Sequence, residues 1–388
     1  MKTKFAVITL FCFVIFAPAL QMMTKAVSIA ELNENRYRAK KPSLLSLVSP
    51  QQFIGDSRKW FNDNYGLRDL LIRAKTQVDF SLFGVSKRVY VGADGWLFYH
   101  AVLDDAKVTL QAMTDNQIAA AVASVARLRD CLSRRGVDLI VVTNQLKDKF
   151  YPEYLPDSAP HYGLRQRFDD FREKMHDVPG VIYIDTTPLL DDLKQRQLIF
   201  HRTDFHWNDA AGFEVGRHIV DTLASRENRA TPFWRIPVDI VTRHFYGGQA
   251  AEMPLFKLPS EQALFVEPHL PEGEIVVEPG AAPIESVHRT TTPRPDLLPP
   301  VAMLSDSFYD AMGRSGFAWH FQKITRSRWW TPLRDVLAAM PPDTKYFMLQ
   351  FIETTLPVLP GEVDKATNNS TSCEIPTSSV SLEGAHTN

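Results

Sequence analysis

The chain has 388 residues, of which 45% are hydrophobic and 23% are charged, and its formal net charge is −2. This composition is that of a globular protein, and the length is enough for one large domain or two small ones. The nearly balanced charge argues against a nucleic-acid-binding protein, because there is no basic surplus to follow a phosphate backbone.

The first residues have the pattern of an export signal. Two lysines precede an apolar run that extends from Phe5 to Leu20. The run is short for a membrane span and has the length of a signal-peptide core, and Ala17-Pro18-Ala19 has the spacing of a cleavage site. An uncleaved signal anchor is the alternative. We therefore expect a signal peptide or signal anchor over residues 1–26 and a linker over residues 27–49.

The three cysteines show neither a metal-binding pattern nor a disulfide framework. Cys12 lies in the apolar run, Cys131 in a predicted helix and Cys373 in a polar C-terminal segment. Their spacing contains no CxxC pair and no Cys/His cluster. We expect Cys131 to be a small core residue.

The main domain is expected over residues 50–356 and begins with helical segments followed by a hairpin. In "RVYVGADGWLFY", β-branched and aromatic residues stand on both sides of a glycine-bearing turn, which predicts a β-hairpin. Thr114, with Gln117 three residues later, has the capping-box spacing of a helix start, and Gly136 closes that helix.

Short apolar runs alternate with helical segments through the rest of this domain. The runs are "VDLIVV", "GVIYID", "VAML" and "KYFMLQFIE". Unbroken apolar runs are typical of strands buried on both faces, and strands that alternate with helices predict right-handed βαβ units around a mostly parallel sheet. The segment from about 231 to 300 is rich in proline and breaks this rhythm, so we predict a loop/β excursion there. Residues 357–388 are rich in Ser and Thr, which predicts a disordered tail.

The stretch "HRTDFHWND", residues 201–209, concentrates titratable side chains. If Thr203–Trp207 is extended, Asp204 and His206 project to the same side. Asp204 can then fix the tautomer of the imidazole, and the other ring nitrogen can accept a proton from a serine. The alternatives are a solvated polar loop and a metal site, and no further ligand motif supports the second. The metal ligands would be His201, Asp204, His206 and Asp209, whereas Asn208 or Asp209 is expected to cap the next helix.

Ser307 has the position of a nucleophile in an α/β fold. In "VAMLSDSFYDAM", a buried strand leads through a small polar turn into a helix. Parallel sheets place ligands at the carboxyl ends of their strands, and the helix start can stabilise an oxyanion through the Ser307 N–H. A helix cap is the alternative role for such a serine. Together with His206 and Asp204, Ser307 predicts a Ser-His-Asp triad.

The ordered set "VGADGWLFY", "KDKFYPEYLP", "TDFHWND" and "LSDSFYDA" resembles the AlgJ/AlgX family of alginate O-acetyltransferases over about residues 50–355. The resemblance implies an SGNH-hydrolase-like three-layer α/β sandwich with a central, mostly parallel sheet and a rearranged order of motifs. It implies that Ser307 is the nucleophile, His206 the general base and Asp204 its orienting partner. Ser305 stands where the family usually has glycine, which we expect to restrict the turn because a side chain disfavours left-handed backbone angles.

The resemblance also implies substrate contacts, partners and a compartment. Lys147, which matches a lysine of the family, is a candidate substrate-binding residue together with Trp207 and Tyr309; structural packing is the alternative for each. The implied function is a periplasmic O-acetyltransferase, tethered to the inner membrane, that acetylates an exopolysaccharide through an acyl-serine without a metal or cofactor. The implied partners are the polysaccharide acceptor, a membrane-bound O-acyltransferase that donates acetyl groups, and other polysaccharide secretion proteins. Two alternative functions remain, a carbohydrate acetyl-esterase with the same triad and a non-catalytic glycan-binding or scaffold protein.

Overall fold

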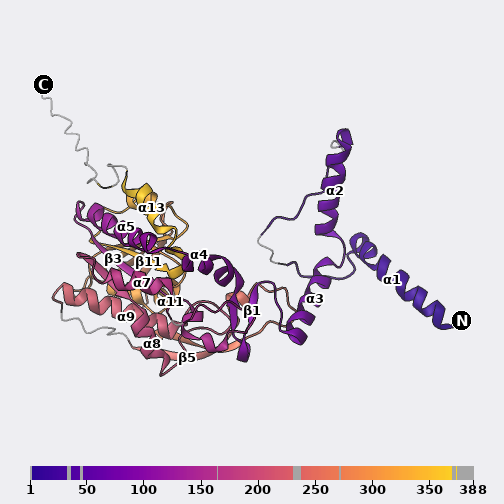
Figure 1. The fold of residues 1–388 in the computed structure, drawn as a ribbon, viewed down its shortest axis with the longest axis horizontal. Helices are drawn as coiled ribbons and strands as arrows, with labels where there is room; N and C mark the ends of the chain where they lie inside the picture. Colours follow the sequence, from indigo (N-terminus) through magenta and orange to yellow (C-terminus); the bar gives the residue numbers. More distant parts are fainter. Residues whose placement is uncertain are drawn as a thin grey trace.

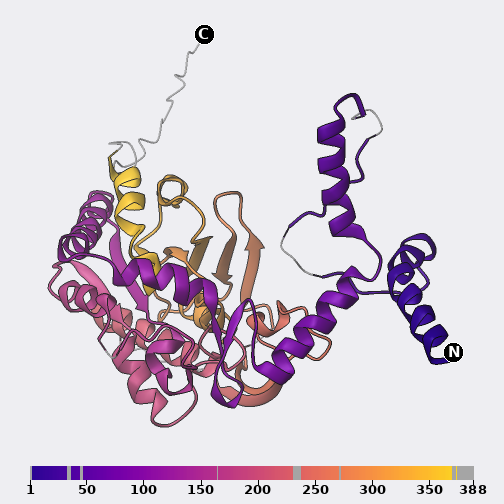
Figure 2. The same ribbon diagram turned by 45° about the vertical axis from the view of Figure 1, so that its right-hand side comes forward.

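The computed structural model describes residues 2–32, 36–43, 47–163, 165–229, 237–270, 272–368 and 373. Figure 1 shows an α/β domain from which three N-terminal helices project to one side. Figure 2, turned by 45°, shows the same separation. These helices are α1 (Lys2–Thr24), α2 (Pro50–Asn64) and α3 (Arg68–Phe83).

Helix α1 contains the apolar run at the N-terminus. By length and composition, its segment Lys4–Thr24 could cross a membrane, and none of that segment's apolar window is buried against the rest of the chain. The end of α1 lies against Gly66, in the turn between α2 and α3, where a Cβ would come within 2.1 Å of the carbonyl oxygen of Pro18. Only glycine allows so close an approach of two backbones. Helix α3 in turn contacts the domain, because Nη1 of Arg73 donates to the carbonyl oxygen of Leu255 at 3.1 Å.

The domain is built on a seven-stranded sheet in which five adjacent strands are parallel. The remaining two strands pair antiparallel at one edge. The α/β fold with a central, mostly parallel sheet that the sequence predicts is therefore confirmed. In spatial order the strands are β4 (Val181–Asp185), β3 (Asp138–Asn144), β11 (Tyr346–Ile352), β9 (Val301–Ser305), β10 (Lys323–Arg328), β8 (Ser286–Thr290) and β7 (Ile275–Pro279).

Helices cover both faces of the sheet and complete three layers (Figure 1). Side chains alternate along a strand, so Leu139 of β3 packs in one core while Ile140 packs in the other. The Thr114 capping box is present as predicted. One face carries α5 (Asp115–Ser133), α7 (Arg167–Met175), α12 (Leu333–Ala338) and α13 (Leu359–Thr367). The other carries α8 (Thr187–Lys194), α9 (Asp209–Arg226), α11 (Tyr309–Arg314) and the 3-10 turn η5 (Phe317–His320).

The predicted hairpin is formed by β1 (Val89–Val91) and β2 (Leu97–Tyr99), which pair antiparallel around the turn η2 (Ala93–Gly95). The backbone N–H of Leu97 donates to the carbonyl oxygen of Arg202 at 2.8 Å, so the hairpin supports the 201–209 stretch. The shorter elements that follow are η3, a π-helix (Ala101–Ala106), α4 (Lys107–Gln111), α6 (Lys147–Phe150) and η4 (Pro152–Tyr154).

The expected excursion over 231–300 contributes more structure than the sequence predicts. Strands β7 and β8 extend the central sheet, and β5 (Val238–Phe245) pairs antiparallel with β6 (Glu261–Pro268) in a small separate sheet. The short helix α10 (Gly248–Ala251) connects these two strands. Residues 231–236 and 271 of this segment lie outside the described residues.

The expectation of a disordered tail from residue 357 is wrong at its start. Residues 353–355 form the turn η6 (Glu353–Thr355), and α13 then packs on α5 and α12. Helix α13 forms because Leu359, Val363 and Ala366 recur at helical spacing and are all fully buried. The rest of the predicted tail lies outside the described residues, apart from residue 373.

Cys131 is buried in the core as expected, but it forms a disulfide with Cys373, which the cysteine spacing did not indicate. The bond joins α5 to a residue 242 positions later in the chain. The sequence could not reveal this pair, because two cysteines so far apart carry no spacing signal. The cross-link restricts the unfolded chain and holds Cys373 on α5.

Replacing Cys373 with serine is expected to lower the free energy of unfolding by about 2–4 kcal/mol, because a large loop of the unfolded chain is released. Urea unfolding of the oxidised wild type and of Cys373→Ser measures the difference. Cys12→Ser serves as the matched control, since Cys12 is an exposed free cysteine in α1. Equal stability of the Cys373 variant and the wild type would contradict the assignment.

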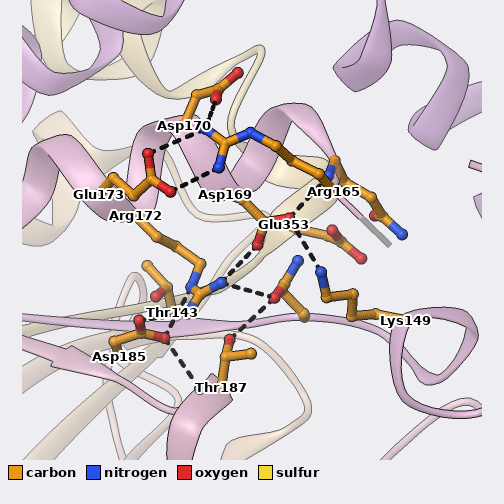
Figure 3. Close-up of polar contacts among 12 residues, drawn as sticks. Thr143, Lys149, Arg165, Asp169, Asp170, Arg172, Glu173, Asp185, Thr187 and Glu353 are labelled. Atoms are coloured by element: carbon orange, nitrogen blue, oxygen red, sulfur yellow. Dashed lines mark hydrogen bonds and ion pairs between the residues drawn. The ribbon is translucent and has the colours of Figure 1, made fainter. Parts of the chain in front are cut away.

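A polar network closes the sheet at the carboxyl ends of β3 and β4 (Figure 3). The guanidinium of Arg172 on α7 donates to both carboxylate oxygens of Asp185, at 2.9 and 2.6 Å, and to Asp169 at 2.6 Å. Lys149 adds an ion pair with Asp169 at 3.0 Å. Each charge in this group has an opposite charge beside it, so the network holds α7 on the sheet and offers no free charge for a ligand.

Candidate active site

The stretch 201–206 is a bent loop closed at its base. Phe200 and Trp207 form an antiparallel bridge, and the N–H of His201 donates to the carbonyl oxygen of His206 at 3.2 Å. Asn208 then caps α9 by accepting from the N–H of Ala211 at 2.9 Å, as the sequence predicts. The expectation that 203–207 is extended is therefore wrong, because the backbone bends through this loop.

The bend still places Asp204 and His206 in contact. Oδ1 of Asp204 accepts from the backbone N–H of His206 at 3.2 Å and lies 2.7 Å from Nδ1 of the same histidine. Oδ2 accepts from the N–H of Gly248 at 2.6 Å. The neighbouring Gly247 packs so tightly that a Cβ would come within 2.2 Å of the carbonyl oxygen of Thr203. The glycine pair at the start of α10 thus brings a backbone donor to the carboxylate.

These contacts decide the charge of Asp204. Its burial away from water opposes ionisation, but the hydrogen bonds from His206 and Gly248 and the nearby imidazole outweigh burial and hold the pKa of Asp204 well below its usual range. Asp204 is therefore a carboxylate at neutral pH. A carboxylate is an acceptor only, so the Nδ1 that faces it carries a proton, and Nε2 of His206 is left as the acceptor.

Ser307 completes a chain of hydrogen bonds across two elements that are far apart in sequence. Strand β9 ends at Ser305, Asp306 Oδ1 accepts from the N–H of Phe308 at 2.8 Å, and α11 begins at Tyr309. In this turn, Oγ of Ser307 lies 2.6 Å from Nε2 of His206. The structure thus brings Ser307, His206 and Asp204 together in the arrangement of a nucleophile, a base and an orienting carboxylate.

Ser305 does not disturb this turn, contrary to expectation. It is the last residue of β9 and is not among the described non-glycine residues with positive φ, so its side chain meets no left-handed penalty. Its Oγ is buried and accepts from Nε of Arg326 at 2.9 Å. Serine here therefore anchors an arginine that also donates to the carbonyl oxygen of Asp306.

A cavity of about 300 Å³ opens onto Ser307 and His206. Phe245 of β5 and Phe265 of β6 form an aromatic wall, and Arg314 of α11 brings a positive charge. Sequence reasoning missed these three residues, because two lie in the segment taken as an excursion. The full lining is His201, Asp204, His206, Trp207, Phe245, Phe265, Ser307, Asp310, Ala311 and Arg314.

The polar residues around the cavity are paired in ways that do not form a metal site. The ring of His201 packs on Phe245 with centroids 4.4 Å apart, and burial lowers its pKa, so it stays neutral. Asp209 pairs with Arg314 at 2.6 Å. Among the residues that the structure describes, no three His, Cys, Asp or Glu side chains are grouped as metal ligands. The metal hypothesis for 201–209 therefore gains no support from this geometry.

Of the three candidate substrate-binding residues, Trp207 is in the lining of the cavity, whereas Lys147 and Tyr309 are not. Lys147, Trp207 and Tyr309 are 2%, 0% and 1% exposed. Trp207 donates its Nε1–H to the carbonyl oxygen of Phe308 at 2.9 Å, and the ring of Tyr309 lies under the guanidinium of Arg326 at 4.4 Å. These contacts favour the packing alternative for Trp207 and Tyr309, whereas Lys147 contacts the backbone of the 201–204 loop.

Asp306, next to the serine, is expected to make stability depend on pH. Burial raises the pKa of its carboxyl to about 7, whereas the unfolded value is near 3.8. The folded state thus favours the protonated form, so the free energy of unfolding should fall as pH rises from about 4 through about 7, by up to about 4 kcal/mol. Asp306→Asn keeps the Oδ1 acceptor and removes the titration, so urea unfolding at either end of this range should show a smaller difference than in wild type. An equal difference would contradict the assignment.

Comparison with known proteins supports the resemblance over part of the chain. Residues 89–233 match the family described as the SGNH hydrolase-like domain of the acetyltransferase AlgX. The chain is also 26% identical over 166 residues to a probable alginate O-acetylase AlgJ of Azotobacter vinelandii, and 30% identical over 171 residues to the AlgJ of Pseudomonas aeruginosa. Over these segments the domain is similar to AlgJ and AlgX proteins.

The similarity is partial in length. The aligned segments cover 42% and 43% of this chain, and they cover 41% and 40% of those two relatives. Solved structures that resemble this one include the O-acetyltransferase domain of Pseudomonas putida AlgJ, with TM-score 0.49, 17% identity, and coverage of 72% of this chain and 99% of that one. Bacillus cereus PatB1 gives a TM-score of 0.48 at 12% identity, over 63% and 92% of the two chains. The matched region of the AlgJ/AlgX-like domain contains Asp204 and His206 and ends before Ser307.

Proposed function

We propose that this AlgJ/AlgX-like protein is an O-acetyltransferase that moves acetyl groups to hydroxyls of an exopolysaccharide through an acyl-serine. The observation that carries the proposal is the contact of Ser307 Oγ with Nε2 of His206 at 2.6 Å, while Asp204 occupies Nδ1 at 2.7 Å. A serine so placed can be deprotonated as it attacks, which an unassisted hydroxyl cannot be at neutral pH. The similarity to AlgJ and AlgX supports this reaction class, and the cavity at Ser307 supports a binding place for the acceptor.

In the first half-reaction, Nε2 of His206 takes the proton of Ser307 as Oγ attacks the carbonyl carbon of an acetyl donor. The tetrahedral oxyanion is stabilised by the backbone N–H of Ser307. When the bond to the leaving group breaks, His206 returns the proton to that group, and acetyl-Ser307 remains. Asp204 stabilises the imidazolium while it exists.

In the second half-reaction, a sugar hydroxyl gives its proton to His206 and attacks the acetyl carbon. The bond to Oγ breaks, Ser307 takes the proton back, and the sugar leaves as an acetyl ester. If water attacks in place of the sugar, the same steps make the protein an acetyl-esterase. The choice between the two depends on which nucleophile reaches acetyl-Ser307, so it needs a measurement.

The compartment is proposed on two features outside the site. Helix α1 is long and apolar enough to serve as a signal or an anchor. A disulfide between Cys131 and Cys373 forms and persists in oxidising compartments such as the periplasm. We therefore place the domain in the periplasm, tethered by α1, with a membrane-bound O-acyltransferase as the partner that delivers acetyl groups.

The experiment supplies the full chain, in detergent, with p-nitrophenyl acetate as donor and follows where the acetyl group goes. Alginate oligosaccharides serve as the acceptor because the relatives are named alginate O-acetylases. Acetylated sugar that appears at the expense of free acetate supports the transferase. Acetate release that added sugar does not reduce supports the esterase, and the absence of both products contradicts either enzyme and leaves the glycan-binding or scaffold alternative.

A further inference from the structure

Lys147 is a buried lysine beneath the loop that carries Asp204 and His206. It begins α6, and only 2% of the residue is exposed. Its Nζ lies 2.6 Å from the carbonyl oxygen of Asp204, 3.1 Å from that of His201 and 3.2 Å from that of Arg202. An ammonium group has three N–H donors and no acceptor, so these three carbonyl oxygens occupy all of its donors.

The other side of the ammonium faces aromatic rings of the hairpin. Nζ lies 5.5 Å from the ring centroid of Trp96 and 5.2 Å from that of Phe98. The negative faces of aromatic rings attract a cation, as carbonyl oxygens do. Lys107, the neighbouring buried lysine, is instead paired with the carboxylates of Asp148 and Glu353. The surroundings of Lys147 thus favour a cation, and they bind the ammonium to backbone carbonyl oxygens and not to carboxylates.

We propose that Lys147 is a positioning residue whose ammonium holds the 201–204 backbone in place. The carboxylate of Asp204 then stays hydrogen-bonded to Nδ1 of His206, and Nε2 of His206 stays in contact with Oγ of Ser307. The inference rests on the proposed function, because it concerns the same site. Lys147 does not line the cavity at Ser307, so it acts through Asp204 and His206 without touching substrate. When the ammonium loses a proton, a nitrogen lone pair faces one of the three carbonyl oxygens, and the loop loses a hydrogen bond.

The buried surroundings of Lys147 bring the loss of its proton near neutral pH. Burial away from water lowers the pKa of Lys147 to about 7, and the carboxylates of Asp204, Glu261 and Asp148 oppose that shift. The neutral ring of His201 is the other titratable group whose electrostatic interaction with Lys147 is resolved. The ammonium form is present below the pKa, so the held loop is the low-pH form and is lost as pH rises through that value.

The test measures how fast phenylmethylsulfonyl fluoride modifies Ser307 in the full chain, by intact mass, between about pH 6 and about pH 9. The variants are Lys147→Met, which keeps the length without the charge, and Lys147→Arg, which stays protonated throughout. Lys194→Met is the matched control, because Lys194 also donates to a backbone carbonyl, that of Phe150, and lies 4.7 Å from the ring centroid of Tyr151, away from Ser307.

Wild type is expected to lose reactivity on the alkaline side of about pH 7, whereas Lys147→Arg retains it there. Lys147→Met is expected to react about 100-fold more slowly at every pH, with kcat for acetyl transfer lowered and KM for the oligosaccharide unchanged. Lys194→Met should follow wild type. If Lys147 only filled space in the core, reactivity would not fall on the alkaline side in wild type and persist there in Lys147→Arg.

Three outcomes overturn the inference. The first is a Lys147→Met variant that reacts as fast as wild type. The second is an alkaline loss that Lys147→Arg shares with wild type. The third, which needs no variant to fold, is a wild-type profile that does not fall on the alkaline side. If wild-type Ser307 is not modified at any pH, the proposed function fails, and this inference fails with it, which distinguishes that result from the other three.

Discussion

Replacing Ser307 with alanine is expected to lower the rate of acetyl transfer by roughly four to six orders of magnitude, because the nucleophile that forms the acyl intermediate is removed. The fold should be unaffected, since Oγ of Ser307 points to His206 at the cavity and its loss leaves no buried donor without an acceptor. Transfer from p-nitrophenyl acetate to alginate oligosaccharides measures the effect, and thermal unfolding checks the fold.

Ser315→Ala is the matched control. Ser315 lies at the end of α11, is buried, and donates its hydroxyl to the carbonyl oxygen of Ala311 at 2.8 Å, outside the cavity. This variant is expected to lose about 1 kcal/mol of stability and to keep nearly all activity. Activity in Ser307→Ala similar to that in the control would rule out an acyl-serine and favour a scaffold protein.

Replacing Asp204 with asparagine is expected to lower activity by about 10⁴-fold while leaving the fold intact. Both oxygens of Asp204 accept hydrogen bonds, Oδ1 from His206 and Oδ2 from Gly248. An amide has one oxygen only. If the oxygen faces Gly248, the NH₂ group donates to Nδ1 of His206, which forces the ring proton onto Nε2 and removes the acceptor that Ser307 needs. If the oxygen faces His206, the NH₂ group opposes the N–H of Gly248.

The control for this prediction is Asp185→Asn. Asp185 has little exposed surface, pairs with Arg172 in the network of Figure 3, and is not in the lining of the cavity at Ser307. Its replacement should reduce stability, because Arg172 loses a partner, but folded protein should keep its activity. The measurement is the rate of acetyl transfer per folded molecule in Asp204→Asn and in Asp185→Asn. Equal loss in both variants would show that Asp204 matters for folding and not for the tautomer of His206.

The sheet and the hydrogen-bonded residues could be predicted from the sequence because they depend on local patterns. Strands such as Val301–Ser305 are unbroken apolar runs, which only a strand covered on both faces can bury. Asp204 and His206 are two positions apart, so any compact loop leaves them near each other. Their pairing with Ser307 followed from its position at the end of a parallel strand, where an α/β fold gathers polar residues.

The rest depends on contacts between distant segments. Phe245 and Phe265 reach the cavity because β5 and β6 form a small sheet of their own. The proline-rich sequence of this segment does not predict that sheet. The disulfide of Cys131 and Cys373 spans 242 positions. The adjacent glycines Gly247 and Gly248 were a signal that could have been used, since a glycine pair marks a close approach of backbone. Lys147 looked like a ligand-binding lysine, and only its three carbonyl partners indicate otherwise.

The most direct test of an acyl-serine mechanism is to look for acetyl on Ser307. The full chain is mixed with p-nitrophenyl acetate, quenched in acid and digested, and tandem mass spectrometry locates the acetyl group. If Ser307 is the nucleophile, acetyl is found on Ser307 in wild type, is absent from Ser307 in His206→Ala, and is transferred to alginate oligosaccharides when these are added before quenching. Two results would contradict an acetyl-Ser307 intermediate. One is acetylated sugar without acetyl on Ser307 when the reaction is quenched rapidly, and the other is acetyl on a different residue that the reaction requires.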